Sequence, residues 1–188
     1  SYNSEFDDPM GAPVENPLFI AENFSDKRNM KDFIVNNYLD YEFIPGLNFR
    51  TSFGLKFNLN QTELWKSSKI GTYADKSSPA TAAAIDKKGL NWLNENTLTY
   101  KKNFNEKHDL NVVAGLTVQK DTYSQLSAGA TDFPTDYIHY LSAGTINSGT
   151  HLKSEWSMVS LLARANYVYD NKYMLTATVR RDGSSRFG

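Results

Sequence analysis

Residues 47–60, with the sequence LNFRTSFGLKFNLN, alternate between apolar and polar side chains. Successive side chains of a β-strand point to opposite faces, so this pattern predicts a strand with one apolar and one polar face. Strands of soluble domains usually run about 5 or 6 residues. A tilted strand that crosses hydrocarbon needs about 9 to 11 residues, and this segment has about 14. It is therefore long enough to span a membrane.

The same alternation recurs on both sides of three short turns. Pro45 and Gly46 form the first turn, because proline presets φ and glycine accepts a positive φ. The second and third turns are expected at Asn105–His108 and Asp170–Lys172. We therefore predict three long hairpins, which span residues 31–60, 90–120 and 156–181.

The segments between the hairpins lose the alternation. Residues 61–89 and 121–155 are expected to be long loops, as are residues 1–29 before the first hairpin. The alanine-rich stretch Ala80–Lys87 favours a short helix within residues 61–89. Compact soluble domains rarely keep loops of this length without a functional reason.

Short turns that alternate with long loops are typical of outer-membrane barrels, with periplasmic turns and extracellular loops. The aromatic residues beside the short turns fit a girdle at the periplasmic interface. They are Tyr41, Phe43, Tyr100, Phe104, Tyr167, Tyr169 and Tyr173. Six strands cannot close, because bacterial barrels begin at about eight. The predicted fold class is therefore all-β: a sector of a larger antiparallel transmembrane β-barrel in the bacterial outer membrane.

Composition excludes several other classes. The net charge of −1 argues against a nucleic-acid partner. A mean hydropathy of −0.53 and the lack of any run of about 18 apolar residues argue against a helical membrane protein. The chain starts without a basic and apolar leader, so we expect a removed signal or an excerpt from a longer chain. With no cysteine, disulfides and thiolate chemistry are excluded.

The segment Ser160–Gly188 carries a specific motif. A strand with the pattern Arg-x-Asn-Tyr-x-Tyr is followed by Asp-x-Lys-Tyr, a short strand and Asp-Gly-Ser-Ser-Arg-Phe-Gly. These positions are Arg164, Asn166, Tyr167, Tyr169, Asp170, Lys172, Tyr173, Asp182, Gly183, Ser184, Ser185, Arg186, Phe187 and Gly188. The motif resembles the SusC/RagA family of TonB-dependent outer-membrane transporters of Bacteroidota. Residues 31–57 and 96–119 look like the preceding hairpins of the same barrel.

The resemblance implies a barrel of about 22 strands with a plugged lumen. It also implies import of a glycan or peptide oligomer, a SusD-like surface lipoprotein as partner, and energy from TonB. The plug domain and the TonB box would lie upstream and are expected to be absent from this sequence. Outer-membrane lipid would surround the barrel.

Aromatic residues of the long loops are the candidate ligand-binding residues. The candidates are Trp65, Tyr73, Tyr137 and Tyr140. Sugars and peptides present apolar faces that stack on aromatic rings. The alternative is that these rings pack the loops onto the lipoprotein or anchor them at the outer interface. Both interpretations stay open at this point.

Charged residues at the alternate positions that form the polar face of each strand are expected to face the barrel lumen. They include Arg50, Lys56, Arg164 and Arg180. Lumen charges contact a plug through ion pairs or select what passes, and contact with the plug is favoured here by analogy.

No motif predicts catalysis, a metal or a cofactor. The three histidines, His108, His139 and His151, lack the spacing of metal ligands. Asp132 and Asp136 flank Pro134 without a calcium-loop pattern, which favours turn chemistry. The alternative to a transporter, from another class, is a soluble β-sandwich or adhesin-like module whose long loops bind a ligand. Such a module requires shorter strands whose apolar face is buried against a second sheet.

Overall fold

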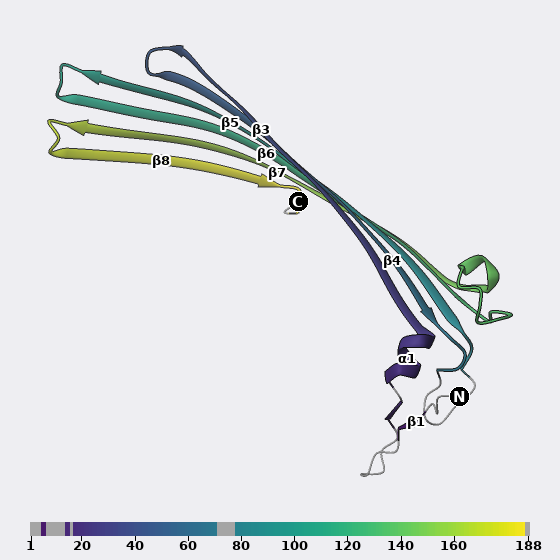
Figure 1. The fold of residues 1–188 in the computed structure, drawn as a ribbon. Coiled ribbons are helices and arrows are strands. Elements are labelled where there is room, and N and C mark those ends of the chain that lie inside the picture. The colour runs from purple at the N-terminus through teal and green to yellow at the C-terminus, as the bar shows by residue number, and fades with distance from the viewer. Residues whose placement is uncertain (1–4, 7–13, 16, 71–77, 187–188) are drawn as a thin grey trace. The chain divides into compact units, whose positions relative to one another are not determined.

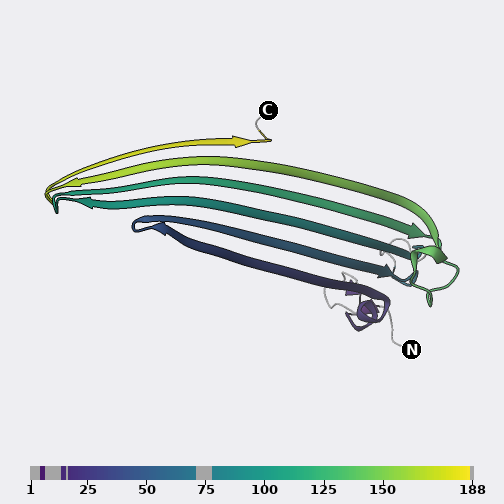
Figure 2. The ribbon, with the colours of Figure 1, turned by 90° about the horizontal axis from the view of Figure 1, so that it is seen from above.

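The computed structural model describes residues 5–6, 14–15, 17–70 and 78–186. In chain order, its elements are β1 (Glu5–Phe6), β2 (Val14–Glu15), α1 (Pro17–Asn23), β3 (Phe24–Ile44), β4 (Leu47–Lys66), β5 (Thr81–Phe104), β6 (His108–Thr131), η1 (Leu141–Ala143), β7 (Thr145–Tyr169) and β8 (Tyr173–Ser184) (Figure 1). The strands β3 to β8 form one sheet in chain order, and Figure 2 shows them running side by side. The predicted all-β fold of long antiparallel strands is confirmed.

The chain divides into two compact units that both contain parts of the long strands. The loop unit consists of Ser1–Lys31, Asn58–Lys88 and Ser124–Lys153, and the turn unit consists of Asp32–Phe57, Gly89–Tyr123 and Ser154–Gly188. The three tight turns lie in the turn unit. The two long connections, residues 67–80 and 132–144, lie in the loop unit.

Two of the tight turns each contain two residues with a left-handed backbone, and three of these four residues are Asn or Asp. Asn105 and Glu106 have φ of 50° and 58°, and Asp170 and Asn171 have φ of 49° and 52°. Two consecutive residues with positive φ match the right-handed twist of the flanking strands, and Asn and Asp adopt that conformation at lower cost than most residues. The sequence therefore fixes where each of these hairpins reverses.

Gly46 is required for two reasons. Its φ is +89°, and a Cβ at this position would lie 2.1 Å from the carbonyl oxygen of Lys101. The Lys101 amide also donates to the Gly46 carbonyl, with an N–O distance of 2.7 Å. Glycine therefore lets the first hairpin pack directly against the backbone of β5.

The turn unit has two chemically different faces. In the pairing of β7 with β8, Leu161 lies opposite Arg181 and Ala163 lies opposite Val179, whereas Arg164 lies opposite Thr178. Odd-numbered residues of these two strands therefore share the apolar face, and even-numbered residues share the polar face. This agrees with the alternation expected from the sequence.

The long sheet has little core of its own. Among the described residues, the buried hydrophobic side chains are those of Trp65, Ala80, Ala82 and Ala130. Large apolar side chains such as Phe53 stay exposed. Apart from this sheet, the described residues form only the sheet of two-residue strands β1 and β2. Among the described residues, no second sheet covers the apolar face of the long strands, as a β-sandwich requires. The structure therefore argues against the soluble β-sandwich.

Across the residues described, none of the helices has both the length and the apolar character that a membrane crossing requires.

The strands are longer than the sequence predicted. Parts of all three predicted loops are strand: residues 24–29 belong to β3, residues 61–66 to β4, and residues 121–131 and 145–155 to β6 and β7. The backbone ladder continues there although the apolar alternation has ended, because hydrogen bonds between strands do not require an apolar face. Strand lengths of 20 to 25 residues for β3 to β7 are the result.

Two further local predictions were wrong. The helix expected over Ala80–Lys87 is instead the start of β5, where the Gln61 amide donates to the Asp86 carboxylate across the ladder at 3.2 Å. Pairing with neighbouring strands outweighs the helix propensity of alanine. Within the predicted loop 1–29, Pro17 begins the short helix α1, a position where its missing N–H costs nothing.

Candidate functional site

The connection between β6 and β7, residues 132–144, folds over the end of β4 and forms one wall of a cavity in the loop unit. The cavity has a volume of about 530 Å³. Its lining residues are Lys27, Glu63, Leu64, Ala82, Ala83, Ala84, Tyr137, His139, Tyr140, Leu141 and Ser142. A lysine, a carboxylate and two phenols beside an apolar floor are the mixture that binds a molecule with both polar and apolar parts.

Tyr137 and Tyr140 are the most accessible aromatic residues of this site. Their exposed fractions are 92% and 77%, although large aromatic side chains are usually covered. The residues beside them are held: Asp136 is half-buried, and His139 stacks on Trp65. The connection therefore presents two tyrosines from an anchored backbone.

Asp136 anchors the connection through three hydrogen bonds from the two serines that directly follow β4. Its carboxylate accepts from the Ser67 hydroxyl at 2.9 Å, the Ser68 amide at 3.1 Å and the Ser68 hydroxyl at 2.8 Å. Burial, the largest single influence, raises the pKa of Asp136. The bonds from Ser68 and Ser67, together with the charge of Lys69, outweigh it, so the pKa lies below its ordinary value. The carboxylate is charged at neutral pH.

Trp65 is placed differently from the two tyrosines. Its side chain is only 5% exposed, and its ring packs edge-on against Phe133 with centroids 4.8 Å apart. On one face it stacks against His139 at 4.3 Å. Trp65 therefore shapes the site by fixing the connection, while a ligand would meet Tyr137 and Tyr140 first. Tyr73, the fourth aromatic candidate, lies outside the described residues.

The predicted lumen charges lie on one face of the turn unit. The Arg50 guanidinium lies 4.6 Å above the ring centroid of Tyr38, and Arg180 forms an ion pair with Asp182 at 2.9 Å. Arg164 donates to Asn166 at 3.3 Å, and Lys56 is exposed. Arg50, Arg164 and Arg180, at even-numbered positions of β4, β7 and β8, thus each have a neutral or acidic neighbour.

Sequence reasoning missed the parts of the loop site that depend on the folded connection. Neither Lys27 nor Glu63 belongs to a recognisable motif, and Asp136 was assigned only to turn chemistry. Its partners Ser67 and Ser68 are far from it in the chain, so no spacing signals the contact. Among the residues that the structure describes, no cluster of three or more metal-ligating side chains occurs.

No protein-family model matches the chain. Three TonB-dependent receptors of Formosa agariphila are similar to it in sequence. Receptor P3 is 35% identical, and the match covers 95% of this chain and 18% of the receptor. Receptor P39 is 32% identical, with 92% of this chain and 17% of the receptor covered. Receptor P26 is 28% identical, with 100% of this chain and 19% of the receptor covered. The chain thus spans about a fifth of the length of these relatives.

Solved structures of the RagAB peptide transporter contain a region with the same fold. One matches with a TM-score of 0.87 and 22% identity over 100% of this chain and 21% of its own. The closed-closed state matches with a TM-score of 0.85 and 23% identity over 95% and 20%.

TonB-dependent receptors reside in the bacterial outer membrane, which agrees with the location predicted for this sheet. The sequence similarity covers nearly the whole chain, and the fold similarity covers all six long strands. The chain is therefore similar in sequence to one part of TonB-dependent receptors, and its fold matches a sector of the RagA barrel.

Proposed function

We propose that this chain forms part of the wall of a transporter that imports an oligomeric nutrient across the outer membrane by a TonB-dependent route. The similarity to named TonB-dependent receptors and to the RagAB peptide importer supports this proposal. A SusD-like lipoprotein is the proposed surface partner. Peptide and glycan oligomers are the two candidate classes of cargo.

The two faces of the turn unit support an orientation for the sheet. In the proposed barrel, the apolar face with Phe53, Leu161 and Val179 contacts lipid. The polar face with Arg50, Lys56, Arg164 and Arg180 contacts the lumen and the plug. The single observation that carries the proposal is this separation of faces along strands twice as long as a membrane crossing needs.

The turns and the connections support a direction across the membrane. Aromatic residues gather beside the tight turns, as in the stacked pair Tyr169 and Tyr173 with centroids 6.5 Å apart. We assign these turns to the periplasmic side, where an aromatic girdle is expected. The loop site of Tyr137 and Tyr140 then faces the cell exterior, where cargo arrives.

In this arrangement, the loop site contacts cargo before it enters the lumen. Exposed phenol rings stack on apolar faces of sugars or peptide side chains, while Lys27 and Glu63 supply one charge of each sign for polar groups. Contact between the same tyrosines and the lipoprotein is the competing use of this surface. Cargo binding by the isolated receptor separates the two, because only the first use persists without the lipoprotein.

Uptake of labelled oligomers by whole cells tests the proposed function. Cells that carry the complete receptor are compared with cells that lack it, each with and without functional TonB. Import of a peptide or glycan oligomer only when both are present is the expected result. Uptake that is independent of TonB, or unchanged by loss of the receptor, contradicts the proposal.

A further inference from the structure

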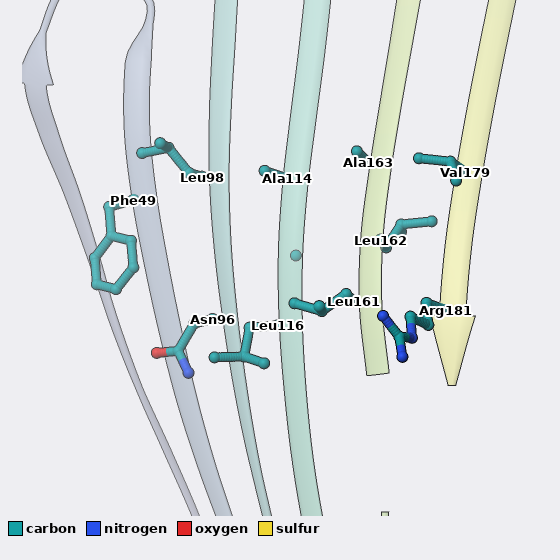
Figure 3. Close-up of a pocket in the computed structure, with 11 residues that line it drawn as sticks. Phe49, Asn96, Leu98, Ala114, Leu116, Leu161, Leu162, Ala163, Val179 and Arg181 are labelled. Carbon is teal, nitrogen blue, oxygen red and sulfur yellow. The ribbon is translucent and has the colours of Figure 1, made fainter. Parts of the chain in front are cut away.

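Two hollows of the structure differ in the hydrogen bonds that they can offer. The groove on the apolar face of the turn unit has a volume of about 440 Å³, and of its described lining residues only Asn96 and Arg181 have polar side chains (Figure 3). The cavity of the loop unit is lined by a carboxylate, a lysine, two phenols, a hydroxyl and the imidazole of His139. We therefore looked in the loop unit for contacts to polar groups of the cargo.

His139 is held in one orientation at this cavity. Its ring stacks on the indole of Trp65, with centroids 4.3 Å apart and 18° between the ring planes. Trp65 belongs to β4, which pairs with a strand on each side, and its side chain is 5% exposed. Nε2 of His139 lies 2.9 Å from the backbone carbonyl oxygen of Asp136. Rotation of the imidazole would break both contacts, so the ring is a fixed part of the cavity wall.

The partner of Nε2 decides where the neutral imidazole carries its proton. A carbonyl oxygen only accepts hydrogen bonds, so Nε2 is the donor. Neutral imidazole has a single N–H, which leaves Nδ1 as an acceptor. Among the residues that the structure describes, no hydrogen bond to Nδ1 of His139 occurs, and the residue is exposed. The fold thus presents an acceptor whose orientation and tautomer are both set by its neighbours.

From this geometry we propose that Nδ1 of His139 is a specificity-determining contact of the loop site, which accepts a hydrogen bond from an N–H or O–H group of the cargo. The proposal rests on the function proposed above and adds the chemical group that the site recognises. Peptides supply N–H donors and glycans supply O–H donors. The rings of Tyr137 and Tyr140 stack on apolar parts of the same molecule. Cargo that covers the imidazole without a donor leaves Nδ1 unpaired and loses affinity.

Binding of cargo to the complete receptor in detergent, without the lipoprotein, tests the proposal. The probes are the labelled peptide or glycan oligomer that cells import in the uptake experiment, and the same oligomer methylated at its N–H or O–H groups. His139→Gln keeps an N–H for the Asp136 carbonyl and removes the ring acceptor. We expect this variant to bind the unmethylated oligomer about 3- to 10-fold more weakly than the wild type does. Methylation should weaken binding to the wild type more than binding to His139→Gln, by the same factor.

His151→Gln is the matched control, because His151 is an exposed histidine of β7 and is not among the described residues that line the cavity. Its affinity for the oligomer should stay within about twofold of the wild type. Hydrogen exchange at the Ser68 amide, which donates to Asp136, reports whether the connection keeps its place. Exchange in His139→Gln should equal that in the wild type. Weaker binding that comes with faster exchange, or equal binding by His139→Gln and the wild type, overturns the proposal.

A measurement without cargo separates this proposal from the proposed function. Solid-state NMR of the receptor with isotope-labelled histidine identifies the protonated ring nitrogen, because Nε2 is bonded to Cδ2 and Nδ1 is not. The signal of His139 is assigned by its loss in His139→Gln. At about pH 8, where histidine side chains are generally neutral, we expect the proton on Nε2. A proton on Nδ1 overturns the proposal whatever the receptor imports.

The two experiments together show which proposal fails. Import of an oligomer with equal binding by the wild type and His139→Gln rejects the histidine contact alone. A proton on Nε2 in a receptor that imports no oligomer rejects the proposed function, and the contact with it.

Discussion

The imidazole of His139 stacks on the indole of Trp65, with centroids 4.3 Å apart and an angle of 18° between the rings. This contact joins the connection between β6 and β7 to the end of β4. Asp136 joins the same two segments through Ser67 and Ser68. The two anchors lie on either side of Tyr137, so the connection has little freedom to carry this tyrosine away from the cavity.

Removing the charge of Asp136 is expected to loosen the connection. Asp136→Asn loses a charged acceptor of three hydrogen bonds, which lowers the local free energy of opening by about 1–3 kcal/mol. Hydrogen exchange at the Ser68 amide, which donates to Asp136, should accelerate accordingly. Asp132→Asn is the control, because Asp132 is exposed, with a φ of 56° that asparagine tolerates. Equal exchange in both variants contradicts the anchoring role.

The same anchor has a defined pH dependence. The folded-state pKa of Asp136 lies below the ordinary value of 3.8, so its stabilising effect is complete above that value. It is lost as the pH falls through the lowered pKa. Exchange at the Ser68 amide, corrected for its intrinsic pH dependence, should therefore be constant between pH 7 and 5. It should rise only below the ordinary value, and this step should be absent from Asp136→Asn. A midpoint near neutral pH would show that another group controls the connection.

The exposed tyrosines are expected to contribute to cargo affinity and not to assembly. Tyr137→Ala and Tyr140→Ala each remove one stacking surface. Each substitution should raise the oligomer concentration needed for half-maximal uptake by about 2- to 10-fold. The amount of barrel in the outer membrane stays unchanged, because both side chains are exposed. Tyr137→Phe and Tyr140→Phe keep the rings and retain most of the uptake. Unchanged uptake in both alanine variants would remove these residues from the ligand site.

The first turn is expected to tolerate no side chain. Gly46→Ala places a Cβ 2.1 Å from the Lys101 carbonyl oxygen at a φ of +89°, which costs about 1–3 kcal/mol in stability. Thermal unfolding of the detergent-solubilised receptor measures the loss. Gly149→Ala is the matched control, because its Cβ would meet no atom within 4 Å. Equal melting temperatures for the two variants would refute the close packing at Gly46.

The sequence predicted the alternating part of the long hairpins well, for a physical reason. In the proposed barrel, lipid covers one face of residues 47–60, so side chains there alternate and the period is visible in the chain. Residues 121–131 stay in β6 through backbone hydrogen bonds that leave no apolar period. The loop site was only partly predictable. Exposed tyrosines are recognisable by type, whereas the anchor of Asp136 depends on a contact between distant segments.

Lipid accessibility along β4 tests the central claim, that this sheet is the wall of an outer-membrane barrel, most directly. Single cysteines at Ser52, Phe53, Lys56 and Phe57 of the complete receptor are labelled with a fluorophore, and quenching by nitroxide-labelled phospholipid is measured. The account predicts strong quenching at Phe53 and Phe57 and weak quenching at Ser52 and Lys56. Uniform quenching, or none at any of the four positions, would contradict it.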